Sequence, residues 1–181
     1  MTSRAHRAVR AAAVLALLAL AGCGFRPVYM PSEGGAPGPA ARNLAAIHVA
    51  LIPDRPGQVL REALQRRLHG ADNATPRRYI LTVAYWIPGV AAGIQPDSIP
   101  TRLQLTANAV WTLTLNDAAK TRVTSGSARA QDGVDLFDQQ YFAADLNESA
   151  AYRRLAGQVA DQIALRLAGF FRARADQRPN S

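Results

Sequence analysis

The sequence predicts an α+β domain, a two-layer sandwich in which two helices pack on one face of a four-stranded mixed sheet. The expected order of elements is β-α-β-β-β-α. Two segments place apolar residues at helical spacing, and four have the alternation or the β-branched and aromatic content of strands. Each helical segment has a single apolar stripe, so both need a surface to cover. The first helix separates two strands and predicts a right-handed crossover, whereas the last three strands predict an antiparallel meander.

The first 22 residues have the parts of a bacterial signal peptide in the expected order. Three arginines precede an unbroken Ala/Leu/Val run over 11–21, which is too short to be a permanent membrane span. Leu20-Ala21-Gly22 then places small residues before Cys23, the only cysteine of the chain. We expect cleavage before Cys23 and lipid attachment to this residue. The alternative is an ordinary secretory signal followed by a chance cysteine.

Removal of residues 1–22 leaves 159 residues, which suffice for one domain with its own core. This mature chain has 18 basic and 13 acidic residues, and its net charge of +5 favours anionic partners mildly. Prolines and glycines predict a lipidated, flexible tether over 23–43. A single domain is expected over 44–175, and a disordered tail over 176–181.

The first strand is expected over 45–52, where apolar and small residues alternate before Pro53 ends the pattern. A helix follows, because Pro56 suits a first helical turn. Its apolar stripe recurs every four residues, at Leu60, Leu64 and Leu68, and Gly70 is a suitable C-cap. A second strand over 78–87 is rich in aromatic and β-branched residues.

Residues 89–101 are expected to form a long connection, and long loops often have a function. The strongest strand pattern follows over 103–115, with apolar residues on one face and mostly Gln, Thr and Asn on the other. Trp111 and Leu113 share the apolar face, so we expect both to lie in the core between sheet and helices.

A fourth strand is expected over 121–130 and a loop over 133–144. The last helix is expected to begin at Asp145, since Glu148 three residues later completes a capping-box pattern. Its stripe of large apolar residues is flanked by alanines that allow close approach to a sheet.

Catalytic motifs are not evident in the mature chain. His48 and His69 lack the spacing of a metal site or of a base beside a nucleophile. We therefore expect no enzyme activity, no cofactor and no metal. A periplasmic lipoprotein enzyme is the alternative, and it would need ionisable residues that converge in a cleft.

Three groups of residues resemble the LptE family of lipopolysaccharide (LPS) assembly lipoproteins. They are the start of the mature chain, Cys23-Gly24-Phe25-Arg26-Pro27, then Ile94-Gln95-Pro96-Asp97-Ser98 with Thr101-Arg102, and the last helix around Ala150-Ala151-Tyr152-Arg153-Arg154-Leu155. The resemblance implies a lipid-anchored outer-membrane protein that sits inside the LptD β-barrel. It would help that barrel to fold and to deliver LPS to the outer leaflet. Gly24, in place of an aspartate that retains lipoproteins in the inner membrane, favours outer-membrane delivery.

Barrel contacts are expected at the 89–101 connection, through Gln95, Ser98 and Arg102. Lys120 and Arg122 are the candidates for binding anionic groups of LPS, with ordinary solvated turn charges as the alternative. A hairpin between the third and fourth strands would place Arg102 and the Lys120–Arg122 pair at opposite ends. The alternative function is that of an accessory lipoprotein in a lipid or solute transport system.

Overall fold

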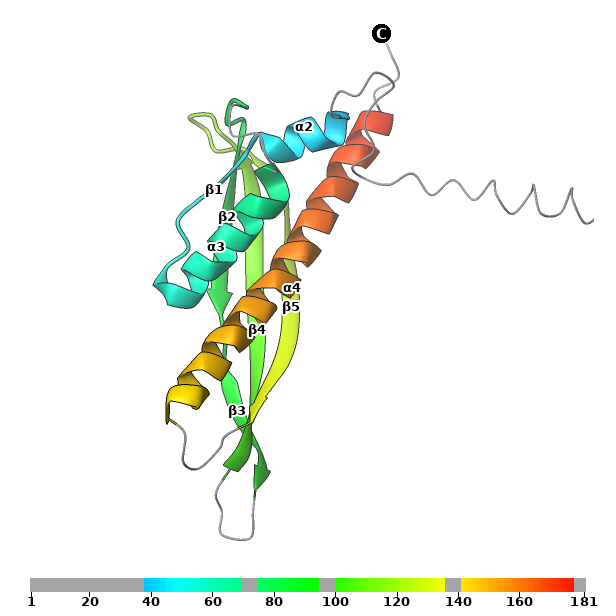
Figure 1. Ribbon diagram of the computed structural model, residues 1–181. Helices are drawn as coiled ribbons and strands as arrows, with labels where there is room; N and C mark the ends of the chain where they lie inside the picture. Colours follow the sequence, from blue (N-terminus) through cyan, green and yellow to red (C-terminus); the bar gives the residue numbers. More distant parts are fainter. Residues whose placement is uncertain (1–37, 70–74, 95–99, 136–140, 178–181) are drawn as a thin grey trace, which may run out of the picture.

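The computed structural model describes residues 38–69, 75–94, 100–135 and 141–177. In these residues it has three helices and five strands, in the order α2 (Pro39–Ala45), β1 (Ile47–Val49), α3 (Asp54–His69), β2 (Tyr79–Trp86), β3 (Gly89–Ile94), β4 (Pro100–Leu115), β5 (Arg122–Asp135) and α4 (Tyr141–Asp176). The long helices α3 and α4 lie on one face of an open sheet (Figure 1). This arrangement confirms the predicted two-layer α+β class.

The sheet is built around β4, which has partners on both edges. β5 pairs with one edge over nearly the whole length of β4. On the other edge, β2 and β3 pair with successive parts of β4 and keep one register, from Tyr79 opposite Leu115 to Ile94 opposite Pro100. β2 and β3 are thus one antiparallel strand with a short interruption, and β1 adds parallel to the start of β2.

The prediction of a long connection over 89–101 is wrong, because residues 89–94 form a strand, β3, which is the fifth strand of the sheet. Pro88, which lacks a backbone N–H, stands between the paired residues of β2 and those of β3. In the structure the Pro88 carbonyl still accepts a hydrogen bond from the Thr106 N–H, with 3.0 Å between N and O. The ladder therefore continues past the proline into β3, and residues 95–99 at the turn lie outside the described residues.

The start of the domain also differs from the prediction. Helix α2 occupies the end of the expected tether over 23–43 and the start of the expected strand over 45–52. Pro39 lies in its first turn, where a missing N–H costs nothing, and Ala40 and Leu44 are buried. Packing of these two residues against the rest of the core explains a helix where composition suggested a tether.

The junction between β5 and α4 is shorter than the loop expected over 133–144. β5 continues to Asp135 and α4 begins at Tyr141. Asp145 therefore lies inside the helix and does not cap it. The Glu148 carboxylate instead accepts a hydrogen bond from the Tyr152 hydroxyl, one turn along the same helix.

The core lies between the sheet and the helices, and Trp111 and Leu113 belong to it as predicted. Trp111 is 3% exposed and Leu113 is fully buried. The indole ring lies over Gly126 of β5, where a Cβ atom would come within 2.7 Å of the ring atom Cζ2. Small residues on α4 provide the close approach that the sequence suggested, because Ala156, Ala160, Ala164 and Ala168 are all buried.

Candidate functional site

The face of the sheet opposite the helices, here called the open face, has no helix over it in the described residues (Figure 1). Antiparallel pairing places side chains of β2, β4 and β5 in rows on it, such as Ala84–Val110–Ser127 and Trp86–Asn108–Arg129. The rows are mainly polar, but three large apolar residues stand among them. Their exposed fractions are 50% for Trp86, 51% for Val110 and 67% for Val90. The open face thus combines polar rows with a few exposed apolar side chains.

A group of four basic residues, here called the basic end, lies where β2 begins and β5 begins. It contains Arg77, Arg78, Lys120 and Arg122. The Asn116 backbone N–H donates to the Arg78 carbonyl and the Asn116 side chain donates to the Arg77 carbonyl, at 2.9 and 3.0 Å between N and O. These bonds hold the turn between β4 and β5 against the start of β2.

The cationic side chains of the basic end are accessible to an anionic ligand. All four side chains are exposed, and the ion pairs found in the described part of the chain involve none of them. Lys120 has a positive φ of 48°, and the Asp117 carboxylate accepts a hydrogen bond from the Thr121 N–H at 3.3 Å. The turn is thereby fixed while its cationic groups point to solvent.

Arg77 and Arg78 were not singled out from the sequence. They precede the second strand and look like ordinary flanking charges. Only the register of the sheet, which sets Tyr79 opposite Leu115 and Thr114 opposite Arg122, brings them beside Lys120 and Arg122. A correct prediction of that register would have found them.

Arg102 lies at the other end of the sheet. It pairs across strands with Asp135, whereas Arg122 pairs with Thr114 at the far end of β4. The expected separation of Arg102 from the Lys120–Arg122 pair is therefore confirmed. The Arg102 guanidinium lies over Gly133, where a Cβ atom would be 2.5 Å from Nη2. Gln95 and Ser98, the other expected barrel contacts, lie outside the described residues, as does Cys23.

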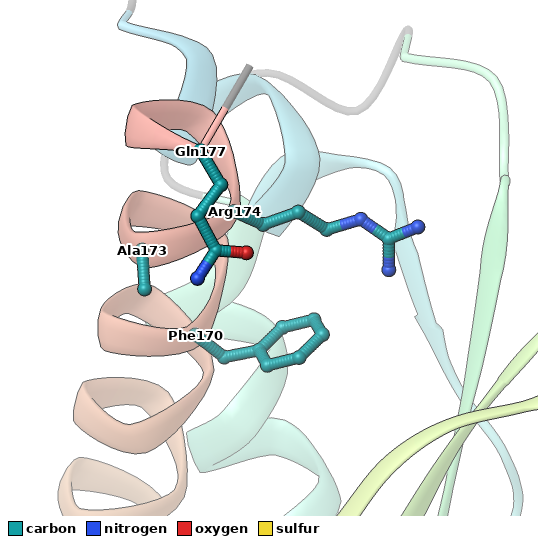
Figure 2. Close-up of a pocket in the computed structure, with 4 residues that line it drawn as sticks. All are labelled: Phe170, Ala173, Arg174 and Gln177. Carbon is teal, nitrogen blue, oxygen red and sulfur yellow. The ribbon is translucent and has the colours of Figure 1, made fainter.

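A cavity of about 460 Å³ lies at the end of α4 and is lined by Phe170, Ala173, Arg174 and Gln177 (Figure 2). Phe170 and Arg174 point the same way from the helix, with Gln177 beside the ring. These four residues supply one cation and one amide, and they include no carboxylate, imidazole or hydroxyl. Among the described residues, the lining therefore offers no acid–base pair.

Three titratable groups of the described residues have a perturbed pKa: His48 by itself, and the neighbouring phenols of Tyr85 and Tyr152. Burial, helped by the positive charges of Arg77 and Arg61, lowers the pKa of His48 below 6.5. Burial raises the pKa of Tyr85, and the hydrogen bond to Glu148 is the main cause that raises the pKa of Tyr152 to about 12. Both phenols thus remain protonated at neutral pH. In the described ranges no three His, Cys, Asp or Glu residues group as a metal site.

A membrane-spanning helix is not found in the part of the chain that the structure describes. None of its helices combines the length and the apolar character needed to cross a bilayer.

Comparison with solved structures gives the same fold in lipoproteins. A crystal structure of a candidate lipoprotein from Caulobacter crescentus CB15 is 24% identical, covers 74% of this chain and 96% of its own, and has a TM-score of 0.61. The rare lipoprotein B of Shewanella oneidensis is 10% identical over 72% of this chain and 96% of its own, with a TM-score of 0.52. Lipoprotein B of Nitrosomonas europaea is 14% identical over 75% and 88%, with a TM-score of 0.50.

Among curated proteins, none matches the sequence significantly. At the family level, the family described as "LptE: Lipopolysaccharide-assembly" matches residues 44–167. This range takes in every strand of the sheet, all of α3 and most of α4. The chain therefore belongs to the LptE family of lipopolysaccharide-assembly proteins.

Proposed function

We propose that the protein is an outer-membrane lipoprotein that sits in the lumen of an LptD-like β-barrel. There it assists the folding of the barrel and the delivery of LPS to the outer leaflet. It acts by binding, without catalysis. The observation that carries the proposal is the family match over 44–167.

The open face supports a position inside a barrel. Transmembrane barrels with a lumen have polar interiors, and the rows of Thr, Ser, Asn and Gln on the open face are polar as well. Trp86, Val90 and Val110 add apolar contacts that water alone would not favour. A soluble domain with this surface fits a polar enclosure of protein.

The test of this function is co-purification. The acylated protein, tagged at its C-terminus, should bring down a large barrel protein from detergent-solubilised outer membranes. An unrelated tagged outer-membrane lipoprotein is the control. Capture of an inner-membrane transporter in place of the barrel would favour the accessory-lipoprotein alternative and overturn the proposal.

Attachment to the membrane is proposed to occur through Cys23. The motivation is the ordered series of arginines, apolar run and small residues before it, and two or more acyl chains anchor a protein stably. Mass spectrometry of the mature protein should find an acylated N-terminal peptide that begins at Cys23. Recovery of an intact Met1 from mature membranes would contradict the assignment.

Binding of LPS phosphates is proposed at the basic end, where Arg77 and Arg78 join the two residues expected from the sequence. Charge-assisted hydrogen bonds to phosphate are the strongest kind available to these side chains. The double variant Lys120→Glu with Arg122→Glu should weaken LPS binding, and the remaining binding should fall further as salt rises. The matched control is Arg55→Glu with Arg153→Glu, which changes net charge equally at exposed positions elsewhere. Equal loss in both variants would leave the basic end as ordinary surface charge.

The tip between β3 and β4 is proposed to touch the barrel wall, through Gln95 and Ser98 and the nearby Arg102. Photo-crosslinking residues at 95 and 98 should capture the barrel protein. The control position is Gln158, on the exposed side of α4. Failure at both tip positions, with efficient crosslinking of a known complex in parallel, would count against this contact.

A further inference from the structure

The outer edge of β5, here called the capped edge, is blocked by side chains of α4. The Gln162 amide accepts a hydrogen bond from the Arg129 N–H at 3.3 Å and donates to the Arg129 carbonyl at 2.8 Å. Arg166 of α4 donates to the Ser127 carbonyl. Asp132, in β5 itself, accepts a hydrogen bond from the Gly133 N–H at 2.9 Å. Backbone groups that another strand would need are thereby occupied.

The opposite edge has no such protection below β1. β1 covers β2 only from Tyr79 to Leu81. The Thr106 N–H donates to the Pro88 carbonyl, and the Asn116 N–H donates to the Arg78 carbonyl. In β2 and β3 the backbone N–H and C=O groups of even-numbered residues therefore point toward β4. The backbone groups of Tyr85, Ile87, Gly89 and Ala91 therefore point away from the sheet. In the described residues these groups have no hydrogen-bond partner, and we name this stretch the free edge.

Pro88 does not blunt the free edge. Proline on an edge strand normally removes a donor from the exposed side. Here the backbone of residue 88, like that of the other even-numbered residues of β2 and β3, faces β4. The N–H that proline lacks would therefore have pointed toward Thr106 and not toward the outer side of the edge. The donors of Ile87, Gly89 and Ala91 remain on the outside. The one residue that could have discouraged strand pairing thus leaves the edge complete.

Charge does not protect the free edge either. Residues 82–94 contain no charged side chain, although inward-pointing charges and lysines are the usual means of keeping edge strands apart. Gly89, Val90 and Ala91 are exposed. From Tyr85 to Ala91 the edge is about 23 Å long, which is a normal strand length. Such an edge is a template for another extended segment.

We propose that the free edge binds an extended, uncharged segment of the barrel protein as an additional antiparallel or parallel β-strand. This inference rests on the function proposed above and specifies the manner of contact. Main-chain hydrogen bonds would supply affinity, as in other complexes formed by strand addition. The neutral character of residues 82–94 selects a neutral partner segment, because a charged one would lose hydration without gaining a counter-charge.

A second copy of this chain is the less suitable occupant. Two copies joined edge to edge would extend the sheet in one plane and leave Trp86, Val90 and Val110 of both copies exposed. Pairing over about seven residues buries less than the roughly 1,200 Å² of a stable interface. A partner that curves around the molecule covers both the free edge and the neighbouring open face, and the wall of a barrel has that curvature.

The test uses the full acylated chain produced with the LptD-like barrel protein of the same organism. Ala91→Pro removes an outward N–H at an edge position that proline tolerates. Ala91→Val keeps the donor and adds similar bulk at the same exposed site, so it is the matched control. We expect Ala91→Pro to recover about tenfold less barrel protein than wild type, as loss of edge hydrogen bonds implies. Ala91→Val should recover as much as wild type.

Hydrogen exchange of the wild-type chain gives a second reading that does not depend on any variant. The amides of Ile87, Gly89 and Ala91 should exchange rapidly in the free protein and slowly in the complex. Unchanged exchange together with normal recovery by Ala91→Pro would overturn strand addition while barrel binding stands. Protection that appears in the isolated chain as its concentration rises, with dimers, would assign the free edge to a second copy. If wild type captures no barrel protein, the proposed function itself fails.

Discussion

The two edges of the sheet are treated in opposite ways. At the capped edge, Gln162 and Arg166 of α4 bond to the backbone of β5, and the Arg154–Asp132 ion pair, 2.7 Å between N and O, adds a further link. At the free edge, Tyr85 to Ala91 carry no charge, and no helix among the described residues covers their outer side. One chain thus contains both the usual protection against strand pairing and a stretch without it.

The difference shows where the molecule tolerates contact. Helix α4 is long enough to follow β5, and its polar side chains at 162 and 166 reach over the edge because they flank its buried stripe. On the other side, α3 ends its cover near β1 and the start of β2. The free edge is therefore a position for a partner, whereas the capped edge is closed by the fold itself.

The largest effect on stability should come from truncating Trp111, whose side chain packs against β5, the strand of the capped edge. Trp111 lies between β5 and the helices with its ring on Gly126, so Trp111→Ala should lower the free energy of unfolding by about 3–5 kcal/mol. Urea unfolding of the unacylated mature chain measures this. Val110→Ala, one residue away on the open face, should change it by less than about 0.5 kcal/mol. An equal loss in both variants would contradict the assignment of the two faces.

A smaller effect is expected when the cap itself is removed. Gln162→Leu takes both hydrogen bonds from Arg129 and should cost about 1 kcal/mol, because water replaces part of what is lost. It should also make the protein associate more strongly in sedimentation velocity, since the edge is opened. Gln158→Leu, one turn earlier on the exposed side, is the control. Identical behaviour of the two variants would show that the cap has no protective role.

Protection can also be added to the free edge. Val90→Lys places a charge on an exposed position of the edge strand and should reduce association with the barrel protein, measured by co-purification with the acylated chain. Its free energy of unfolding should stay within about 0.5 kcal/mol of wild type. Ser125→Lys puts the same charge on the open face next to the capped edge and should leave association unchanged. Stronger association by Val90→Lys would argue against the free edge as the site of pairing.

The smallest effect concerns β1, the strand that covers the first part of β2. The pKa of His48 is lowered in the folded state, so the unfolded chain binds the proton more tightly. The contribution of neutral His48 to stability is fully present above its unfolded pKa of about 6.5, and it is lost as pH falls from there through the folded pKa. His48→Gln should flatten this part of a stability profile measured between pH 5 and 8. A profile as steep as wild type would assign the dependence to other groups.

Elements with strong chemical contrast were predictable from the sequence. The alternation of β4, the leucine stripe of α3 and the apolar stripe of α4 placed the core, including Trp111, on the correct sides. β3 was not predicted, because its Gly, Val and Ala residues give almost no contrast between the two faces of a strand. α2 was not predicted, because its seven residues lie beside a proline-rich stretch and become helical only through the packing of Ala40 and Leu44.

The candidate site was predictable only in part, for a related reason. Lys120 and Arg122 stand out because they flank a turn within the chain. Arg77 and Arg78 are remote in sequence and become neighbours only through the pairing of β2 with β4. The free edge keeps its outward N–H groups because the backbone of Pro88 faces β4. Composition does not tell which way the backbone of a given residue faces within a sheet.

Strand β4 also sets a length scale for the molecule. Its 16 residues span about 50 Å, which exceeds the roughly 30 Å of a bilayer's hydrocarbon layer. Helix α2 lies at the end of the sheet where α4 finishes, and the end of β3 and the start of β4 lie at the opposite end (Figure 1). In a domain that stood with β4 along the membrane normal, the two ends of the sheet would therefore lie on opposite sides of the hydrocarbon layer. The sheet would then act as a rigid spacer that links the two sides of the membrane within one folded unit.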